Sequence, residues 1–216
     1  MSLWADFQNN TGRLIHKPKH YLPIYERHLA RFVNQTVTLF EIGCGHGGSV
    51  AMWKRFLGPN ARIVGIDIRE ECSAFEEDQV FIRIGSQADT RFLGKLVSEF
   101  GQPDIVIDDG SHQMSHIRAT FDFLYPKTNQ RGVYIVEDLN FAYNPNLGGG
   151  YREPRSFIEY SKELIDRLHA RYTEEVAEDE FTRTTLSMHV YDSMIIFERG
   201  RHDTTVHQHR GRQPSK

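Results

Sequence analysis

The chain has 216 residues, enough for one domain with its own core and too few for two full-sized domains. Its 26 basic and 29 acidic residues give a formal net charge of -3, which argues against nucleic acid or an anionic membrane surface as the main partner. Hydrophobic residues make up 39% of the chain and include 14 Phe and 9 Tyr, so wholesale disorder is excluded.

The two cysteines, Cys44 and Cys72, lack the spacing of a zinc site or a redox motif. The N-terminal segment is polar and basic where a signal peptide would be apolar. No apolar run approaches the roughly 20 residues that a membrane span requires. We therefore expect a cytoplasmic protein that has no membrane partner.

Helix and strand patterns alternate along the chain. Apolar residues at helical spacing predict a first helix over 21–32, and a β-branched run predicts a strand over 36–40. The further predicted helices are 49–57, 92–100 and 114–124, and the further predicted strands are 63–66, 80–84, 103–108 and 132–136. Such alternation predicts an α/β fold with a doubly wound, mostly parallel sheet that helices cover on both faces.

The pattern changes after the glycines at 148–150. A helix over 157–168 is followed by strands over 184–190 and 194–197, which predict a terminal antiparallel hairpin. We expect three parts: a leader with a helix that packs on the domain (1–35), the main domain (36–198) and a disordered polar tail (199–216).

The first predicted strand runs into a glycine-rich turn, Glu41-Ile-Gly-Cys-Gly-His-Gly-Gly48, directly before a helix. Glycines let the backbone turn tightly and approach a ligand closely. A dinucleotide fingerprint reads G-x-G-x-x-G, whereas this turn reads E-x-G-x-G-x-G, and its leading carboxylate suits a cationic ligand better than a phosphate. Asp67 ends the next strand, where an acid can accept hydrogen bonds from ribose hydroxyls. The alternative is a tight β–α connection that binds nothing.

This turn and Asp67, together with the βα order and the terminal hairpin, resemble the class I S-adenosylmethionine-dependent methyltransferases over residues 36–198. The resemblance implies a seven-stranded sheet and S-adenosylmethionine as the cofactor. The implied contacts are Gly43, Gly45 and Gly47 to the methionine part, Glu41 to its amino group, Asp67 to the ribose, and Ser86 and Gln87 to the adenine.

Acidic residues follow two further strands. The fourth strand ends in Asp108 and Asp109, and the fifth ends in Glu137 and Asp138. Carboxylates that converge at one edge of a sheet repel each other and require a proton or a cation, and oxygen ligands select a hard ion such as Mg²⁺, with Ca²⁺ or Mn²⁺ as substitutes. Asp108 and Asp109 should point to opposite sides of their strand. We therefore predict Asp109, Glu137 and Asp138 as metal ligands and place Asp108 on the cofactor side.

His112 lies three residues after Asp109, close to both predicted sites. Histidine titrates nearer to neutral pH than other side chains, which suits a general base, so we predict His112 as the catalytic residue. In the alternative interpretation, Asp109 and Glu137 cap helices and His112 is a solvated turn residue.

Asp-Asp-Gly-Ser-His at 108–112 and Val-Glu-Asp at 136–138, followed by Tyr143 and a Gly-Gly pair, narrow the resemblance. They resemble the metal-dependent sugar O-methyltransferases of natural-product biosynthesis, among them macrolide-sugar and rhamnose enzymes. The segment 16–31 is similar to the leader of small bacterial homologues described as cephalosporin-hydroxylase-like. The resemblance implies Mg²⁺ held by the three predicted ligands, His112 as the base, a sugar hydroxyl as the acceptor, and a homo-oligomer.

Two departures bear on the acceptor. Residues 139–143 read Leu-Asn-Phe-Ala-Tyr, whereas many relatives carry His or Tyr and then Thr-Ser before the Tyr. The extra N-terminal domain of the larger macrolide enzymes is not found in this sequence. From the first departure we expect hydroxyl and imidazole contacts to the substrate to be absent, and the second argues against a macrolide-sized acceptor.

The loop with the glycines at 148–150 also carries Tyr143, Tyr151 and Arg152, which we predict to contact the acceptor. Glycine-hinged loops beside a site often close on substrate, although a loose connection explains the same residues. Two other functions stay open: an NAD-dependent oxidoreductase that uses the same glycine turn and Asp67, and a non-catalytic cofactor-binding module.

Overall fold

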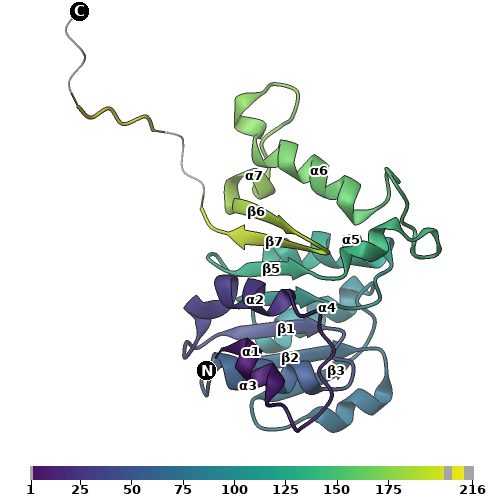
Figure 1. Cartoon of the computed structure of the whole chain (residues 1–216). Coiled ribbons are helices and arrows are strands. Elements are labelled where there is room, and N and C mark those ends of the chain that lie inside the picture. Colours follow the sequence, from purple (N-terminus) through teal and green to yellow (C-terminus); the bar gives the residue numbers. More distant parts are fainter. Residues whose placement is uncertain (1, 202–205, 212–216) are drawn as a thin grey trace, which may run out of the picture.

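The computed structural model describes residues 2–201 and 206–211, and within these ranges seven strands form a single sheet (Figure 1). Their order across the sheet is β3-β2-β1-β4-β5-β7-β6. The strands are β1 (Thr38–Ile42), β2 (Arg62–Asp67), β3 (Val80–Ile84), β4 (Ile105–Asp108), β5 (Val133–Val136), β6 (Thr185–Tyr191) and β7 (Met194–Arg199).

The sheet is parallel from β3 to β5, whereas β7 pairs antiparallel with both β5 and β6. This arrangement confirms the predicted doubly wound sheet with its terminal hairpin. The strand order reverses between β1 and β4. Open α/β sheets bind their ligands at such a reversal, outside the carboxyl ends of the strands.

Helices cover both faces of the sheet (Figure 1). The α-helices are α1 (Leu3–Gln8), α2 (Tyr21–Leu29), α3 (Gly48–Leu57), α4 (Thr90–Phe100), α5 (Met114–Leu124), α6 (Phe157–Leu168) and α7 (Glu180–Thr184). The 3₁₀ segments are η1 (Ala30–Phe32), η2 (Glu70–Phe75), η3 (Tyr125–Lys127), η4 (Leu139–Tyr143), η5 (Pro145–Leu147) and η6 (Ala170–Tyr172).

Successive residues of each strand point to opposite faces and therefore belong to two different cores. Leu39 of β1 packs in the core beneath α1, α2 and α3, whereas its neighbour Phe40 packs in the core beneath α4, α5 and α6. Both faces of the central strands are thus buried, which explains why these strands read as continuous apolar runs rather than as alternating ones.

Local sequence signals explain where the helices begin and end. The Asp89 carboxylate accepts hydrogen bonds from two backbone N–H groups in the first turn of α4, and that helix ends at Gly101, whose φ of 83° suits glycine. Ser156 caps α6 in the same way through the Glu159 N–H.

The strand bounds predicted from the sequence differ from the observed ones by no more than two residues. The first predicted strand, 36–40, begins and ends two residues early, and its end is early because Glu41 reads as the start of a loop. It lies inside β1, where its carboxylate is buried and accepts hydrogen bonds from Ser49 and Trp53. Helices α1 and α7 are not predicted from the sequence. Residues 202–205 and 212–216 of the predicted tail lie outside the described residues.

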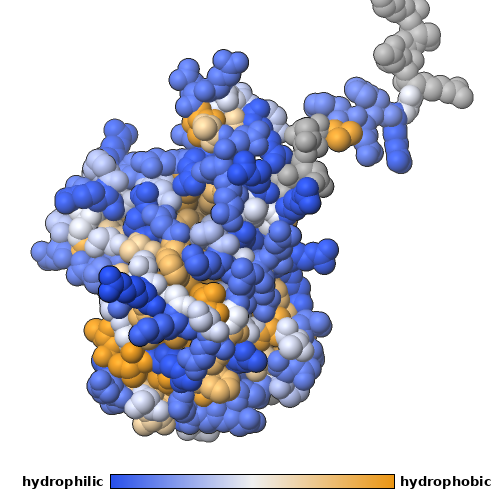
Figure 2. All heavy atoms as spheres, turned by 180° about the vertical axis from the view of Figure 1, so that it is seen from behind, coloured by the Kyte–Doolittle hydropathy of each residue, from blue (hydrophilic) through white to orange (hydrophobic). Residues whose placement is uncertain are grey.

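Seen from behind, hydrophilic residues cover most of the surface, and hydrophobic residues gather toward the lower edge (Figure 2). Within the part of the chain that the structure describes, no helix is both long and apolar enough to cross a membrane.

Candidate active site

The glycine-rich turn after β1 contacts the segment that follows β4. Gly43 has a φ of 86°, and a Cβ atom at this position would lie 1.9 Å from the Asp109 carbonyl oxygen. The Gly43 N–H also donates to the Ile66 carbonyl at 2.7 Å. Only glycine fits this backbone, so the turn is fixed against the ends of β2 and β4.

A cavity of about 510 Å³ opens where the strand order reverses. It is bordered by the glycine turn, by the segments that follow β2, β3 and β4, and by the leader before α2. Of the predicted cofactor-binding residues, those in its lining are Gly43, Gly45, Asp67, Ser86 and Gln87. Glu41, Gly47 and Asp108 are not in the lining.

Asp67 lies on one wall of this cavity. Its carboxylate accepts a hydrogen bond from the Gly45 N–H at 3.0 Å and two from Arg69, at 3.1 Å from the backbone and 3.3 Å from the side chain. Burial opposes the charged form, but these hydrogen bonds hold the pKa of Asp67 below its usual value. Asp67 is therefore an ionised acceptor at neutral pH.

Gln87 lines the cavity and is hydrogen-bonded to Asp108, which does not line it. The Gln87 amide donates to Asp108 at 3.0 Å, and its oxygen accepts the Ser111 N–H at 2.6 Å. Burial raises the pKa of Asp108 to about 7. Asp108 and Asp109 make different contacts. Asp108 is bonded to Gln87, whereas Asp109 is bonded to Lys17 of the leader.

Glu41 is fully buried beneath the turn. Its carboxylate accepts hydrogen bonds from Ser49 at 2.8 Å and from the Trp53 ring at 2.9 Å, and the Lys17 ammonium is 4.0 Å away. Burial raises its pKa, against the opposing effect of Lys17. Glu41 can thus influence a ligand through Lys17 and Ser49, which do line the cavity.

The predicted metal ligands stand at the ends of neighbouring strands, as expected. The Asp109 N–H donates to the Ile42 carbonyl, and the Glu137 N–H donates to the Asp108 carbonyl, both at 2.9 Å. These bonds continue the sheet ladder past the strand ends. The sheet itself therefore brings the carboxylates together.

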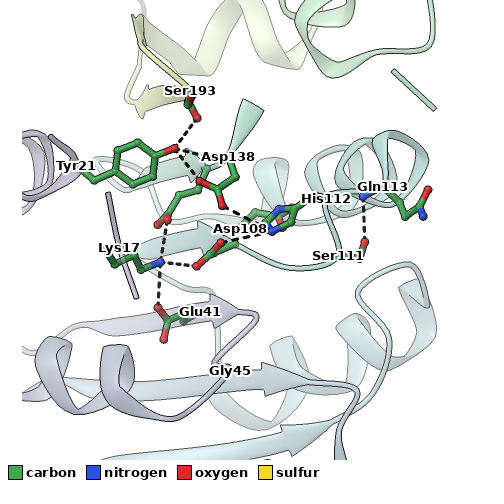
Figure 3. A network of polar contacts seen from close by, with 12 residues as sticks. Lys17, Tyr21, Glu41, Gly45, Asp108, Ser111, His112, Gln113, Asp138 and Ser193 are labelled. Atoms are coloured by element: carbon green, nitrogen blue, oxygen red, sulfur yellow. Dashed lines mark hydrogen bonds and ion pairs between the residues drawn. The ribbon is translucent and has the colours of Figure 1, made fainter. Parts of the chain in front are cut away.

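The ammonium group of Lys17 lies between two of the predicted metal ligands (Figure 3). Lys17 Nζ is 2.5 Å from Asp109 Oδ2 and 2.8 Å from Glu137 Oε2. Burial disfavours the charged lysine, yet the surrounding carboxylates outweigh it and raise the pKa of Lys17 well above its usual value. Burial likewise raises the pKa of Glu137, with Lys17 acting in the opposite direction.

The third predicted ligand faces the predicted base. Asp109, His112 and Asp138 offer ligand atoms that all lie within 4.8 Å of one another. His112 Nε2 is 3.9 Å from Asp109 Oδ1 and 3.7 Å from Asp138 Oδ2, too far for hydrogen bonds and close enough for charge attraction. The ring stacks on Phe141, with the centroids 4.9 Å apart.

Asp138 is held by the leader helix. The Tyr21 hydroxyl is 2.9 Å from Asp138 Oδ1 and 3.0 Å from the Ser193 carbonyl, and it accepts the Asp138 N–H at 3.1 Å. Helix α2 and the turn between β6 and β7 thus hold Asp138 in place (Figure 3). We refer to Asp109, Glu137 and Asp138 as the acid group.

The three residues predicted to contact the acceptor lie together on one exposed loop and outside the cavity. Tyr143 and Tyr151 are 53% and 81% exposed, and Arg152 lies over the Tyr151 ring. The loop is tied to η4, since the Gly150 N–H donates to the Ala142 carbonyl at 2.9 Å.

Several residues of this site are not predicted from the sequence, among them Lys17, Tyr21 and Arg69. Lys17 and Tyr21 contact residues about a hundred positions away, so no local pattern identifies them. The available signal is indirect, because acids gathered at strand ends require a nearby cation and the leader carries a basic segment.

No family model matches the chain. It is 38% identical over 196 residues to the 8-demethyl-8-(2-methoxy-alpha-L-rhamnosyl)-tetracenomycin-C 3'-O-methyltransferase of Streptomyces olivaceus, a match that covers 84% of this chain and 49% of the relative. It is 35% identical to the mycinamicin VI 2''-O-methyltransferase of Micromonospora griseorubida, with 85% and 49% covered. The chain thus spans about half the length of these curated relatives.

Among solved structures, the chain resembles MycE methyltransferase from the mycinamycin biosynthetic pathway in complex with Mg, S-adenosylhomocysteine (SAH) and mycinamycin VI. The TM-score is 0.81 at 32% identity, with 92% of this chain and 53% of that chain covered. The seven-stranded fold agrees with this likeness. The chain therefore belongs to the class I methyltransferases and is related to the sugar O-methyltransferases of macrolide and tetracenomycin pathways.

Proposed function

We propose that this chain is an S-adenosylmethionine-dependent O-methyltransferase that methylates a hydroxyl of a sugar or glycosylated natural product with the help of Mg²⁺. One observation carries the proposal: Asp109 lines the cavity and also belongs to the group formed with His112 and Asp138. A methyl donor in the cavity and an acceptor beside the acids would then meet at Asp109.

The cavity suits the proposed donor. It has the ionised carboxylate of Asp67 on one wall for ribose hydroxyls, and the polar side chains of Ser86 and Gln87 on another for the adenine. The exposed apolar side chains of Leu14 and Ile68 also border it and offer packing surface for a flat ring. S-adenosylmethionine, when bound, supplies an electrophilic methyl group on a sulfonium.

The acid group suits a hard divalent cation. Its proposed donors are the carboxylates of Asp109, Glu137 and Asp138. Asp109 and Asp138 offer ligand atoms within 4.8 Å of each other, and within the described residues the buried Glu137 Oε1 has no hydrogen-bond partner. We propose these three side chains as the Mg²⁺ ligands. Bound there, Mg²⁺ would favour the ionised form of a nearby acceptor hydroxyl.

His112 takes up the proton of the acceptor hydroxyl at Nε2 in this proposal. Stacking on Phe141 holds the ring, and the carboxylates of Asp109 and Asp138 attract the positive charge that the ring gains. The proton then passes to solvent, because the side chain is 22% exposed. The methylated acceptor and SAH are the products.

The exposed loop with Tyr143, Tyr151 and Arg152 is the proposed acceptor contact. Their exposed aromatic faces and the arginine can provide stacking and hydrogen bonding for a sugar ring. The relatives named above act on rhamnosyl and macrolide-linked sugars according to their names, which favours this class of acceptor over others.

The alternative of an NAD-dependent oxidoreductase is not favoured, because the named relatives and the similar solved structure are methyltransferases. The non-catalytic module has no observation in its favour. It would not require His112 and three acids at the edge of the cavity.

The test is methyl transfer from labelled S-adenosylmethionine to simple L-rhamnosides and to the glycosylated acceptors of the two relatives, with Mg²⁺ and with EDTA. We expect transfer to at least one sugar hydroxyl, and its loss in EDTA. Transfer that persists in EDTA would contradict the role of the metal. Failure with all acceptors, despite SAH binding, would favour the module.

A further inference from the structure

The side chain of Lys17 reaches into the acid group from outside the sheet. It belongs to the segment between α1 and α2, yet its ammonium lies 2.5 Å from Asp109, 2.8 Å from Glu137 and 4.0 Å from Glu41 (Figure 3). These acids come from the ends of three neighbouring strands, β4, β5 and β1. The lysine side chain is only 2% exposed, so water contributes little to its solvation.

The path of the leader across the domain positions this contact. The Leu14 carbonyl lies over the start of α3, where a Cβ on Gly48 would be 2.2 Å away. Three residues later Lys17 enters the acid group, and four residues after that Tyr21 binds Asp138. The leader therefore contributes two polar side chains to the group that the strands assemble.

The charges are unequal, because one ammonium faces three carboxylates. Glu41 is compensated in part by Ser49 and Trp53, whereas Glu137 Oε1 has no hydrogen-bond partner among the described residues. The carboxyl groups thus outnumber the one ammonium, and the unpartnered oxygen of Glu137 is left for a further cation beside Lys17.

We propose that Lys17 is a built-in counter-ion, which holds Asp109 and Glu137 together in the metal-free protein and opposes the divalent cation at the same carboxylates. This inference rests on the metal site of the proposed function. Two cations that share carboxylates repel each other, so the lysine weakens metal binding while it keeps the apoprotein folded. Lys17 is then a positioning residue, which acts through the acids and not on the acceptor.

The first test replaces the charge and keeps the apolar stem, with Lys17→Met. In EDTA we expect the Tm to fall by about 10 °C, because the buried carboxylates lose their counter-charge. Saturating Mg²⁺ should raise the Tm of the variant by several degrees more than that of the wild type. Lys54→Met is the matched control, since Lys54 pairs with Glu77 at the surface, 3.4 Å away.

The second test measures Mn²⁺ binding directly by electron paramagnetic resonance. We expect the Kd of Lys17→Met for Mn²⁺ to be at least about tenfold lower than that of the wild type, because one repelling charge is gone. An unchanged or higher Kd would overturn the proposal. A wild type that binds no Mn²⁺ would instead contradict the metal site of the proposed function, so the two failures are distinguishable.

The double variant Lys17→Met with Glu137→Gln keeps the proposal testable if the single variant does not fold. Removing the unpaired acid together with the lysine should restore most of the Tm in EDTA and reduce the additional Mg²⁺ stabilisation. If the double variant remains as unstable as the single one, Lys17 acts by packing rather than by charge, and the proposal is wrong.

Discussion

His112 and Asp138 share an uncommon backbone conformation. Their φ angles are 56° and 54°, in the left-handed region that residues other than glycine seldom adopt. Strain of this kind concentrates at functional sites, where the surrounding contacts enforce it. Here Phe141 stacks on the ring of His112, and the Tyr21 hydroxyl makes two hydrogen-bonding contacts with Asp138, one to its carboxylate and one to its backbone N–H. The two side chains therefore face each other because the backbone is constrained at both.

Replacing His112 tests its role as the base. We expect His112→Gln to reduce methyl transfer by about 100-fold or more and to leave SAH binding unchanged, since the ring does not line the cavity. Initial rates and calorimetry measure the two effects. His169→Gln, at an exposed position after α6, is the control and should behave as wild type. Full activity in His112→Gln would exclude His112 as the base.

Asp67 offers a second test at the residue scale. Asp67→Asn removes the charge that the Gly45 N–H and Arg69 stabilise. We expect SAH to bind about 10- to 100-fold more weakly, because hydrogen bonds to a charged acceptor are lost. Glu71→Gln is the control, as Glu71 is 69% exposed and 3.9 Å from the same arginine. Equal affinities for Asp67→Asn and the wild type would contradict the ribose contact.

Site residues that directly follow a strand can be predicted from the sequence. Site residues that come from the leader cannot. Asp109, Glu137 and Asp138 follow buried strands directly, so their convergence could be expected from the strand pattern alone. Lys17 and Tyr21 belong to a leader whose position on the sheet depends on tertiary packing. Glu41 was expected at the cofactor, yet its burial under Ser49 and Trp53 could not be inferred from strand periodicity.

At the scale of elements, long periodic segments are predictable and short ones are not. Helix α6 has the bounds predicted for it, because Phe157 and Leu164 recur at helical spacing and are buried. Helices α1 and α7, of 6 and 5 residues, are too short to show a period. The hairpin turn is narrower than expected, because Tyr191 already pairs with Met194 and leaves two residues between the strands.

Helix α2 is joined to the terminal hairpin by a buried ionic contact. Glu198 of β7 accepts hydrogen bonds from His28 at 2.6 Å and from Arg31 at 2.5 Å. Burial alone would raise the pKa of Glu198, but these hydrogen bonds hold it below its usual value. A carboxyl whose pKa is lowered by folding stabilises the folded protein at pH values above its pKa in the unfolded state. This stabilisation is lost as the pH falls through its pKa in the folded state.

We therefore expect Glu198→Gln to be less stable than wild type by about 1.5–3 kcal/mol at pH 7. The difference should shrink as the pH falls through the lowered pKa of Glu198 in the folded state, where the wild-type carboxyl itself becomes protonated. Urea unfolding across this pH range provides the measurement, with Glu163→Gln on the exposed face of α6 as the control. A difference that stays constant with pH would show that packing rather than charge joins these elements.

At the scale of the whole molecule, the sheet brings two chemically different regions together. The cavity lies where the strand order reverses at β1 and β4, and the acid group lies one strand further, at β4 and β5. Asp109 belongs to both. This placement explains why one fold can hold a methyl donor and an ionisable acceptor side by side, and why a single strand end connects them.

The residues of the proposed acceptor contact lie at the surface. The chain spans about half the length of the curated relatives, and its loop residues Tyr143 and Tyr151 are largely exposed. The sequence of 139–143 also differs from the expected pattern of relatives. A panel of sugars of increasing size is therefore the appropriate screen, once donor binding is established.

The most direct measurement is calorimetric titration of the protein with SAH, in EDTA and again with Mg²⁺, and with NAD⁺ in a parallel titration. We predict that one SAH molecule binds per chain with a micromolar Kd and that NAD⁺ does not bind. Binding of NAD⁺ in place of SAH would instead favour the oxidoreductase. If neither compound binds, the glycine turn is only a connection between β1 and α3, and the proposed function is wrong.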